Sequence, residues 1–141
     1  MTPLEALQEC LAAEHAAVYV LGTAGGQVST SESPTAAARI RAAYIAHRGR
    51  RDHLRATVSD LGGTPVASAP AYAVDSGAGT TADLTRVAAE TETVCAEVYA
   101  QLTAHSTGRT RAWAVEALVD SSVRLLDLGG APTAWPGLPE L

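Results

Sequence analysis

Residues 4–21, LEALQECLAAEHAAVYVL, decide the fold. Their apolar side chains are spaced by three and four positions, as on one face of an α-helix, and a carboxylate occupies the middle of that face: Leu4, Leu7, Leu11, Glu14, Val18 and Leu21. Residues 40–61 repeat the spacing, with His47 and Arg51 in mid-face positions. Charge inside a helical bundle is costly unless it is paired or bound to a metal. Both stretches therefore predict core helices that carry either a buried ion-pair network or a metal site.

Composition limits the class of protein. The chain has 141 residues, 47% of them hydrophobic, and a net charge of −5, which predicts one compact domain over residues 1–141. Most basic residues lie between Arg39 and Arg55; we interpret them as a solvated helix face and expect no nucleic-acid partner. The first twenty residues lack a basic segment, so we expect no signal peptide, no membrane span and a cytoplasmic protein. Cys10 and Cys95 match no metal or redox spacing, which is typical of small buried residues in a reducing compartment.

Start and stop signals place four helices. Thr2, Pro3 and Glu5 form an N-terminal capping pattern, a Ser-Pro pair repeats it for the second helix, and glycines follow the expected helix ends. The first two helices, and the last two, have short connections and should form antiparallel hairpins, whereas residues 63–80 are long enough to run the length of the bundle. The predicted fold is all-α, a four-helix bundle with one long crossover. Its helices are expected over about residues 3–21, 34–61, 82–105 and 110–128.

Three segments resemble an actinobacterial ferritin-like domain family of unassigned function: residues 13–19 (AEHAAVY), 46–52 (AHRGRRD) and 135–140 (WPGLPE). The resemblance covers nearly the whole chain and implies a fold, not a reaction. Ferritin-like di-metal proteins take a Glu from the first helix, Glu-x-x-His from the second, a Glu from the third and Glu-x-x-His from the fourth. The resemblance thus implies a ferritin-like bundle and the positions at which its metal ligands should lie.

That ligand pattern is incomplete in this sequence. Glu14 fits the first-helix position and His47 the second, but Tyr44 replaces the carboxylate of the second helix. In the fourth helix Glu116 is present and Val119 replaces the histidine. Two ligands are absent, so we expect a degenerate di-iron site that holds no metal pair.

Helical spacing also predicts the inward faces of the last two helices. For the third helix these residues are Leu84, Val87, Thr91, Val94 and Val98, with Glu90 and Glu97 beside them. For the fourth helix they are Ala112, Glu116, Val119, Val123 and Leu126. Glu116 is therefore expected on an inward face, whereas Glu90 and Glu97 could turn inward only with some rotation of the third helix.

The candidate site follows from these faces. We predict a buried polar network of Glu14, His15, Tyr44, His47, Arg48, Arg51, Asp52 and Glu116, with no catalytic residue and no cofactor. In the alternative hypothesis, iron or manganese is held by Glu14, His47, Glu97 and Glu116. The preferred function is a structural or interaction module, expected to be a homodimer. The alternative is a metal-binding or small-molecule-binding ferritin-like protein.

The C-terminal tail, residues 130–141, is rich in proline and is predicted to be extended. It contains Trp135 and Leu138, which expose much apolar area if they stay in water. We therefore expect both side chains to dock on the bundle, as a lid at the helix ends where the crossover begins or ends.

Overall fold

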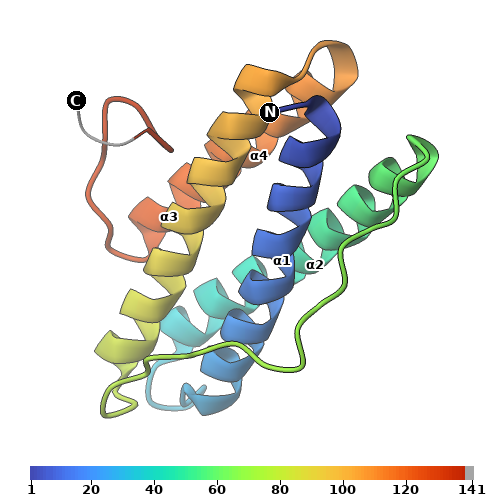
Figure 1. Cartoon of the computed structure of the whole chain (residues 1–141). Helices are drawn as coiled ribbons and strands as arrows, with labels where there is room; N and C mark the ends of the chain where they lie inside the picture. The colour runs from blue at the N-terminus through green and yellow to red at the C-terminus, as the bar shows by residue number, and fades with distance from the viewer. Residues whose placement is uncertain (139–141) are drawn as a thin grey trace.

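The computed structural model describes residues 1–138, and these form four α-helices without a β-strand (Figure 1). The prediction of an all-α four-helix protein is confirmed. Within the described residues, none of the helices has an apolar stretch long enough to cross a bilayer. The helices are α1 (Pro3–Gln27), α2 (Pro34–Asp60), α3 (Thr81–His105) and α4 (Gly108–Asp127).

Local sequence explains where two of the helices begin. At α1, the Thr2 hydroxyl accepts a hydrogen bond from the Glu5 N–H (3.2 Å), and the Glu5 carboxylate accepts one from the Thr2 N–H (2.6 Å). Thr80 and Asp83 form the same reciprocal pair at α3. Each pair satisfies two backbone N–H groups that have no partner inside the helix, and so fixes the helix start.

Helix α1 is longer than predicted, because its glycines do not end it. The helix continues through Gly22 and Gly25 to Gln27. A Cβ added at Gly22 would lie 3.3 Å from the ring of Tyr44, and one at Gly25 would lie 3.6 Å from a methyl group of Ile40. These glycines therefore allow α1 and α2 to approach closely along their shared contact.

The helices pack in a chain of neighbours. Helix α1 packs on α2 and on α3, and α3 packs on α4 (Figure 1). Contact between α2 and α4 is local: a guanidinium N–H of Arg50 donates to the Ser121 hydroxyl (2.9 Å), and the rings of His53 and Trp113 stack with centroids 4.5 Å apart. The centre of the core therefore lies among α1, α2 and α3, while α4 covers the far side of α3.

The crossover, residues 61–80, runs across the outside of α1 on its way to α3 (Figure 1). The Gln8 side-chain amide donates to the Thr64 carbonyl (2.7 Å) and accepts from the Val66 N–H (2.9 Å). The Nε2 atom of His15 lies 3.0 Å from the Val66 carbonyl oxygen. Farther along, the ring centroids of Tyr19 and Tyr72 are 5.6 Å apart. The polar residues of α1 beside its core face thus hold the crossover in place.

The predicted inward face of α4 is wrong, and that of α3 is right only near its start, where Leu84 and Val87 are buried. Both helices are rotated from the expected orientation. On α3, the buried set includes Glu92, Cys95 and Tyr99, whereas the predicted Val94 is exposed. On α4, the buried residues are Ala114, Ala117 and Ser121. Small side chains let α4 lie close to its neighbours, so the larger valines of α4 point outward.

The tail prediction is also wrong for the two side chains expected to dock. Trp135 is 68% exposed and Leu138 is 53% exposed. The Leu138 N–H donates to the Trp135 carbonyl (3.1 Å), which closes a turn. That turn approaches the side of α3 through backbone: a Cβ added at Gly137 would lie 2.3 Å from the Ala96 carbonyl oxygen. Because the contact is made by glycine backbone, the indole lies on the outside of the turn. Residues 139–141 of the predicted tail lie outside the described residues.

Candidate functional site

Three fully buried side chains from three helices meet at the centre of the core. Glu14 comes from α1, His47 from α2 and Tyr99 from α3. The Nδ1 atom of His47 lies 2.7 Å from Oε2 of Glu14, and the Tyr99 hydroxyl donates a hydrogen bond to Oε1 of Glu14. Both carboxylate oxygens of Glu14 therefore have a partner, and this carboxylate is the hub of the cluster.

A second carboxylate, Glu92 of α3, approaches the other side of the imidazole. It is fully buried, and its Oε1 lies 3.1 Å from Nε2 of His47. These two atoms are close enough for an ion pair but are not aligned for a hydrogen bond, and within the described residues neither oxygen of Glu92 has a hydrogen-bond partner. A buried carboxylate without partners is costly, and native proteins seldom keep one without a bound water or ion.

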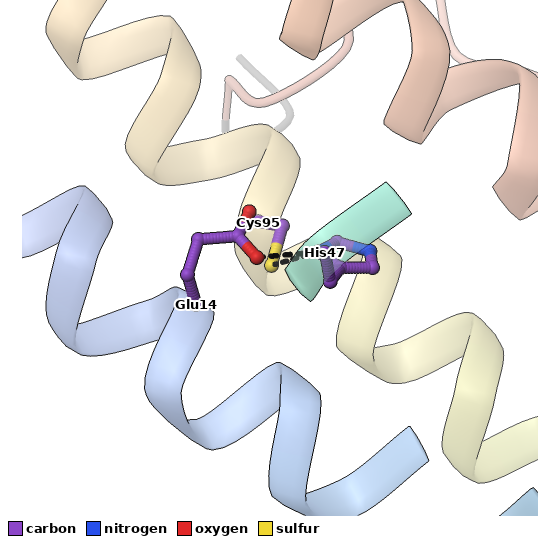
Figure 2. A group of neighbouring side chains, drawn as sticks. All are labelled: Glu14, His47 and Cys95. Carbon is purple, nitrogen blue, oxygen red and sulfur yellow. Dashed lines mark hydrogen bonds and ion pairs between the residues drawn. The ribbon is translucent and has the colours of Figure 1, made fainter. Parts of the chain in front are cut away.

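Cys95 adds a thiol to the same point. Its sulfur lies 3.9 Å from Nδ1 of His47. Figure 2 shows the side chains of Glu14, His47 and Cys95 converging from α1, α2 and α3. One ligand atom from each of these three residues lies within 4.8 Å of the other two. Oxygen, nitrogen and sulfur donors are therefore gathered within the reach of a single small cation.

Protonation of His47 is governed by its neighbours. Burial alone lowers the pKa of the imidazole, but its interactions with Cys95, Glu14 and Glu92 outweigh burial and raise that pKa to about 12. Burial raises the pKa of the Cys95 thiol to about 11. When His47 is protonated and Glu14 and Glu92 are ionised, the three groups carry a summed charge of −1. The cluster therefore has one more negative charge than its own residues neutralise.

Arg50 connects this cluster to α4. Its guanidinium lies over the ring of Tyr99, 5.5 Å from the ring centroid, and donates to the Ser121 hydroxyl at 2.9 Å. It also pairs with Asp120, which accepts a second bond from Arg124 at 2.8 Å. Arg50 therefore joins α2, α3 and α4 around Tyr99. Because it shares Asp120 with Arg124, part of its positive charge also acts on the Glu14 and Glu92 carboxylates.

The structure brings together only part of the predicted network. Glu14 and His47 are direct partners. His15 is buried but faces the crossover, where it contacts the Val66 carbonyl. Tyr44 is half-buried beside Gly22, and the Arg48 guanidinium lies over its ring at 5.6 Å. These last three residues line the helix contacts around the core and do not reach its centre.

The remaining predicted members lie at the surface. Arg51 donates to its neighbour Asp52 at 2.8 Å, so the predicted place of both residues in the buried network is wrong. Glu97 and Glu116 are exposed, which makes the predicted ligand set of Glu14, His47, Glu97 and Glu116 wrong as well. On α2 the adjacent Arg50 is more buried than Arg51, and on α3 the buried carboxylate is Glu92.

Comparison with known proteins identifies the family of this chain. Residues 6–140 match the family described as a domain of unknown function, DUF4439. The chain belongs to this family. A crystal structure of a conserved hypothetical protein, Rv2844, from Mycobacterium tuberculosis is similar, with a TM-score of 0.82 and 27% sequence identity over 90% of this chain and 94% of that chain. No match is found among curated proteins.

Sequence reasoning missed three members of the cluster in this DUF4439 protein, Glu92, Cys95 and Tyr99. A signal for them exists, because the buried face of α3 keeps helical steps of three and four: Leu84, Ala88, Glu92, Cys95, Tyr99 and Leu102. Cysteine is among the most buried residue types, which favours this face over the valine-rich one beside it. In this DUF4439 protein, α3 therefore carries a carboxylate, Glu92, in the middle of its buried face, as α1 carries Glu14.

The residues fit one metal ion and do not fit two. A ferritin-like metal pair needs carboxylate and histidine ligands from all four helices. In the described part of this DUF4439 protein, α4 turns Ala114, Ala117 and Ser121 inward and offers no such ligand to the centre. A single cation, by contrast, finds three donors of different types and a further unpartnered carboxylate.

Proposed function

We propose that this chain is a ferritin-like four-helix protein that binds one divalent metal ion in its core, in place of the metal pair. Glu14, His47 and Cys95 hold the ion, and Glu92 lies on the far side of the imidazole. The observation that carries the proposal is the convergence of three buried donor atoms, from Glu14, His47 and Cys95, within 4.8 Å of one another. The buried Glu92 carboxylate lies 3.1 Å from the opposite imidazole nitrogen, His47 Nε2.

Charge is conserved when a divalent ion binds. Without metal, two carboxylates, one imidazolium and a neutral thiol sum to −1. A divalent ion that replaces the imidazolium proton of His47 and the thiol proton of Cys95 leaves that sum at −1. Metal binding at such a site also releases protons, because the imidazole and the thiol must lose theirs to become ligands. The high pKa of His47 and of Cys95 therefore makes affinity rise with pH.

The imidazole geometry suits a metal ligand. Histidines that bind metal with one ring nitrogen usually donate the other N–H to a carboxylate, which fixes the ring. His47 has such a carboxylate on its Nε2 side, Glu92, and has donors from Glu14 and Cys95 on its Nδ1 side. We assign the metal to the Nδ1 side, where the three ligand atoms gather.

The donor set favours zinc. Zinc accepts thiolate, imidazole and carboxylate together, whereas manganese prefers oxygen donors. All three ligand residues are fully or almost fully buried. A closed site of this kind ties α1, α2 and α3 together, so we assign the metal a structural role that holds the bundle for use as an interaction module.

Zinc titration of chelator-treated protein tests the proposal. The wild-type protein should bind about one equivalent, and Cys95→Ala or Glu14→Gln should weaken binding by more than about 100-fold, with about 10- to 100-fold for Glu92→Gln. Glu97→Gln and Glu116→Gln are matched controls, because these carboxylates are exposed. Circular dichroism establishes that each variant is folded.

Cobalt gives a second readout that does not depend on stability. A thiolate-to-cobalt charge-transfer band should appear in the wild-type protein and be absent from Cys95→Ala. Binding of two ions per chain, or equal zinc affinity in the wild-type protein and in the ligand variants, would contradict a single core site.

A further inference from the structure

The outward face of α4 carries a row of apolar side chains that the monomer leaves in water. Val115, Val119, Val123 and Leu126 are 41%, 56%, 51% and 46% exposed. They are spaced by four, four and three positions, so they lie along one face of α4, opposite the buried Ala114, Ala117 and Ser121. We call these four exposed residues the α4 seam. A continuous apolar seam of this length on a single helix is typical of a helix that packs against a partner.

We propose that the α4 seam binds the same seam of a second copy of this chain, with the two α4 helices antiparallel. The seam is symmetric about Val119: Val115 and Val123 lie four residues to either side, and Ala112 and Leu126 lie seven residues to either side. In an antiparallel pair, Val115 of each helix therefore faces Val123 of the other, and the two Val119 side chains meet at the two-fold axis.

Charge at the ends of α4 supports the same arrangement. Arg109 lies at the start of the helix and Asp127 at its end; both are exposed, and within the described residues neither forms an ion pair. They are eighteen positions apart, which is five helical turns, so both lie on the same flank of α4. Antiparallel pairing about Val119 places Arg109 of each helix within two positions, about 3 Å along the helix axis, of Asp127 of the other.

The helix dipole makes these two charges unfavourable in the monomer. A positive side chain near the helix N-terminus and a negative one near the C-terminus both oppose the macrodipole. In the antiparallel dimer, each of these charges gains an oppositely charged partner, and the dipoles of the two helices also run in opposite directions. A second copy of the chain is therefore complementary both to the apolar α4 seam and to the charges at its ends. A partner without the symmetry of the seam would not be complementary to both.

Measurement of mass in solution tests the proposal first. The wild-type protein should be a dimer by light scattering, and Val119→Glu should raise the dimer dissociation constant by about tenfold or more, because two like charges meet at the axis. Val94→Glu is the matched control, since Val94 is an equally exposed valine on α3. A wild-type protein that stays monomeric, or a dimer that Val119→Glu leaves intact, overturns the proposal.

Disulfide cross-linking tests the register. A mixture of Val115→Cys and Val123→Cys proteins should cross-link under mild oxidation, whereas Val115→Cys alone should not. The native Cys10 and Cys95 are buried and give little background. Cross-linking of Val115→Cys with itself would show a parallel pairing and contradict the proposed one.

Charge exchange tests the ends of the seam. Arg109→Asp should weaken the dimer, because it places like charges opposite each other, and the double variant Arg109→Asp with Asp127→Arg should restore it. Failure of the double variant to recover the dimer would contradict the antiparallel contact. Since these residues lie far from the metal cluster in sequence and on the opposite side of α4, this result is independent of zinc binding.

Discussion

His47 Nε2 lies 3.1 Å from Oε1 of Glu92, and within the described residues Glu92 accepts no hydrogen bond. Glu14, on the other side of the same imidazole, has both of its oxygens bonded. Two buried carboxylates therefore flank one imidazole, one with both oxygens hydrogen-bonded and the other with neither. Glu14 is held by two hydrogen bonds, whereas Glu92 interacts with His47 through its charge alone.

Substitution of the two carboxylates should have unequal effects on stability. In metal-free protein, Glu14→Ala should cost about 3–5 kcal/mol, because it leaves a buried imidazolium and a buried hydroxyl without their acceptor. Glu92→Gln should cost less than Glu14→Ala, because it removes a buried ion-pair partner of His47 but leaves no hydrogen bond broken. Urea denaturation in the presence of a chelator measures both. Equal losses would show that Glu92 is bonded as Glu14 is.

The Tyr99 hydroxyl should contribute measurably to stability. Tyr99→Phe removes the donor to Glu14 Oε1 and leaves that oxygen buried, which should cost about 1–3 kcal/mol. Tyr19→Phe removes a hydroxyl from an exposed tyrosine on α1 and should cost less than about 0.5 kcal/mol. Thermal unfolding of the two variants gives the comparison. A Tyr99→Phe protein as stable as Tyr19→Phe would place the hydroxyl away from Glu14.

Two adjacent arginines should contribute very different amounts to the free energy of unfolding. Arg50→Ala removes the bond to Ser121, the pair with Asp120 and the contact over Tyr99, and should cost about 1–3 kcal/mol. Arg51→Ala removes only a surface pair with Asp52 and should fall within about 0.5 kcal/mol of the wild-type protein. Chemical denaturation distinguishes them. If Arg51→Ala were the more costly change, the orientation of α2 would have to be different.

Stability of the metal-free protein should fall as pH rises above neutrality. The His47 pKa is raised from 6.5 to about 12, so the folded protein keeps a proton that the unfolded chain loses. The stabilisation is therefore fully present below about pH 6.5 and is lost progressively toward pH 12, at up to about 1.4 kcal/mol per pH unit. Measurements between about pH 7 and 8 lie below the ordinary range of the thiols. His47→Gln should lose this slope, and His53→Gln, on the exposed side of α2, should keep it.

The sequence pattern was sufficient to predict the four helices and two members of the cluster, Glu14 and His47. Leucine spacing on α1 is regular enough that Glu14 must lie inside, and the same argument places His47 inward on α2. The resemblance stated above rests on residues 13–19, 46–52 and 135–140, and of what it implies the structure shows four helices. Caps at Thr2 and proline at the start of α2 gave the helix starts closely.

Rotation of α3 and α4 could not be predicted from hydrophobicity alone. Both helices carry valines on one face and small or polar residues on another, and the pattern favoured the valines. Close packing favoured the small side chains on α4, and the Cys95 and Tyr99 face on α3, because these surfaces fit their neighbours. The sequence also does not decide which of the adjacent arginines, Arg50 or Arg51, points toward the core. That depends on how α2 packs on its neighbours.

Anomalous scattering at the zinc absorption edge, from a crystal of the wild-type protein grown with zinc, tests the central claim most directly. The expected result is a single peak among Glu14, His47 and Cys95, with Glu92 against the opposite nitrogen of the imidazole. Two peaks would restore the metal pair of the ferritin-like proteins. No peak at the cluster, with zinc bound elsewhere or not at all, would show that Glu14, His47 and Glu92 form a closed ion-pair network that needs no metal.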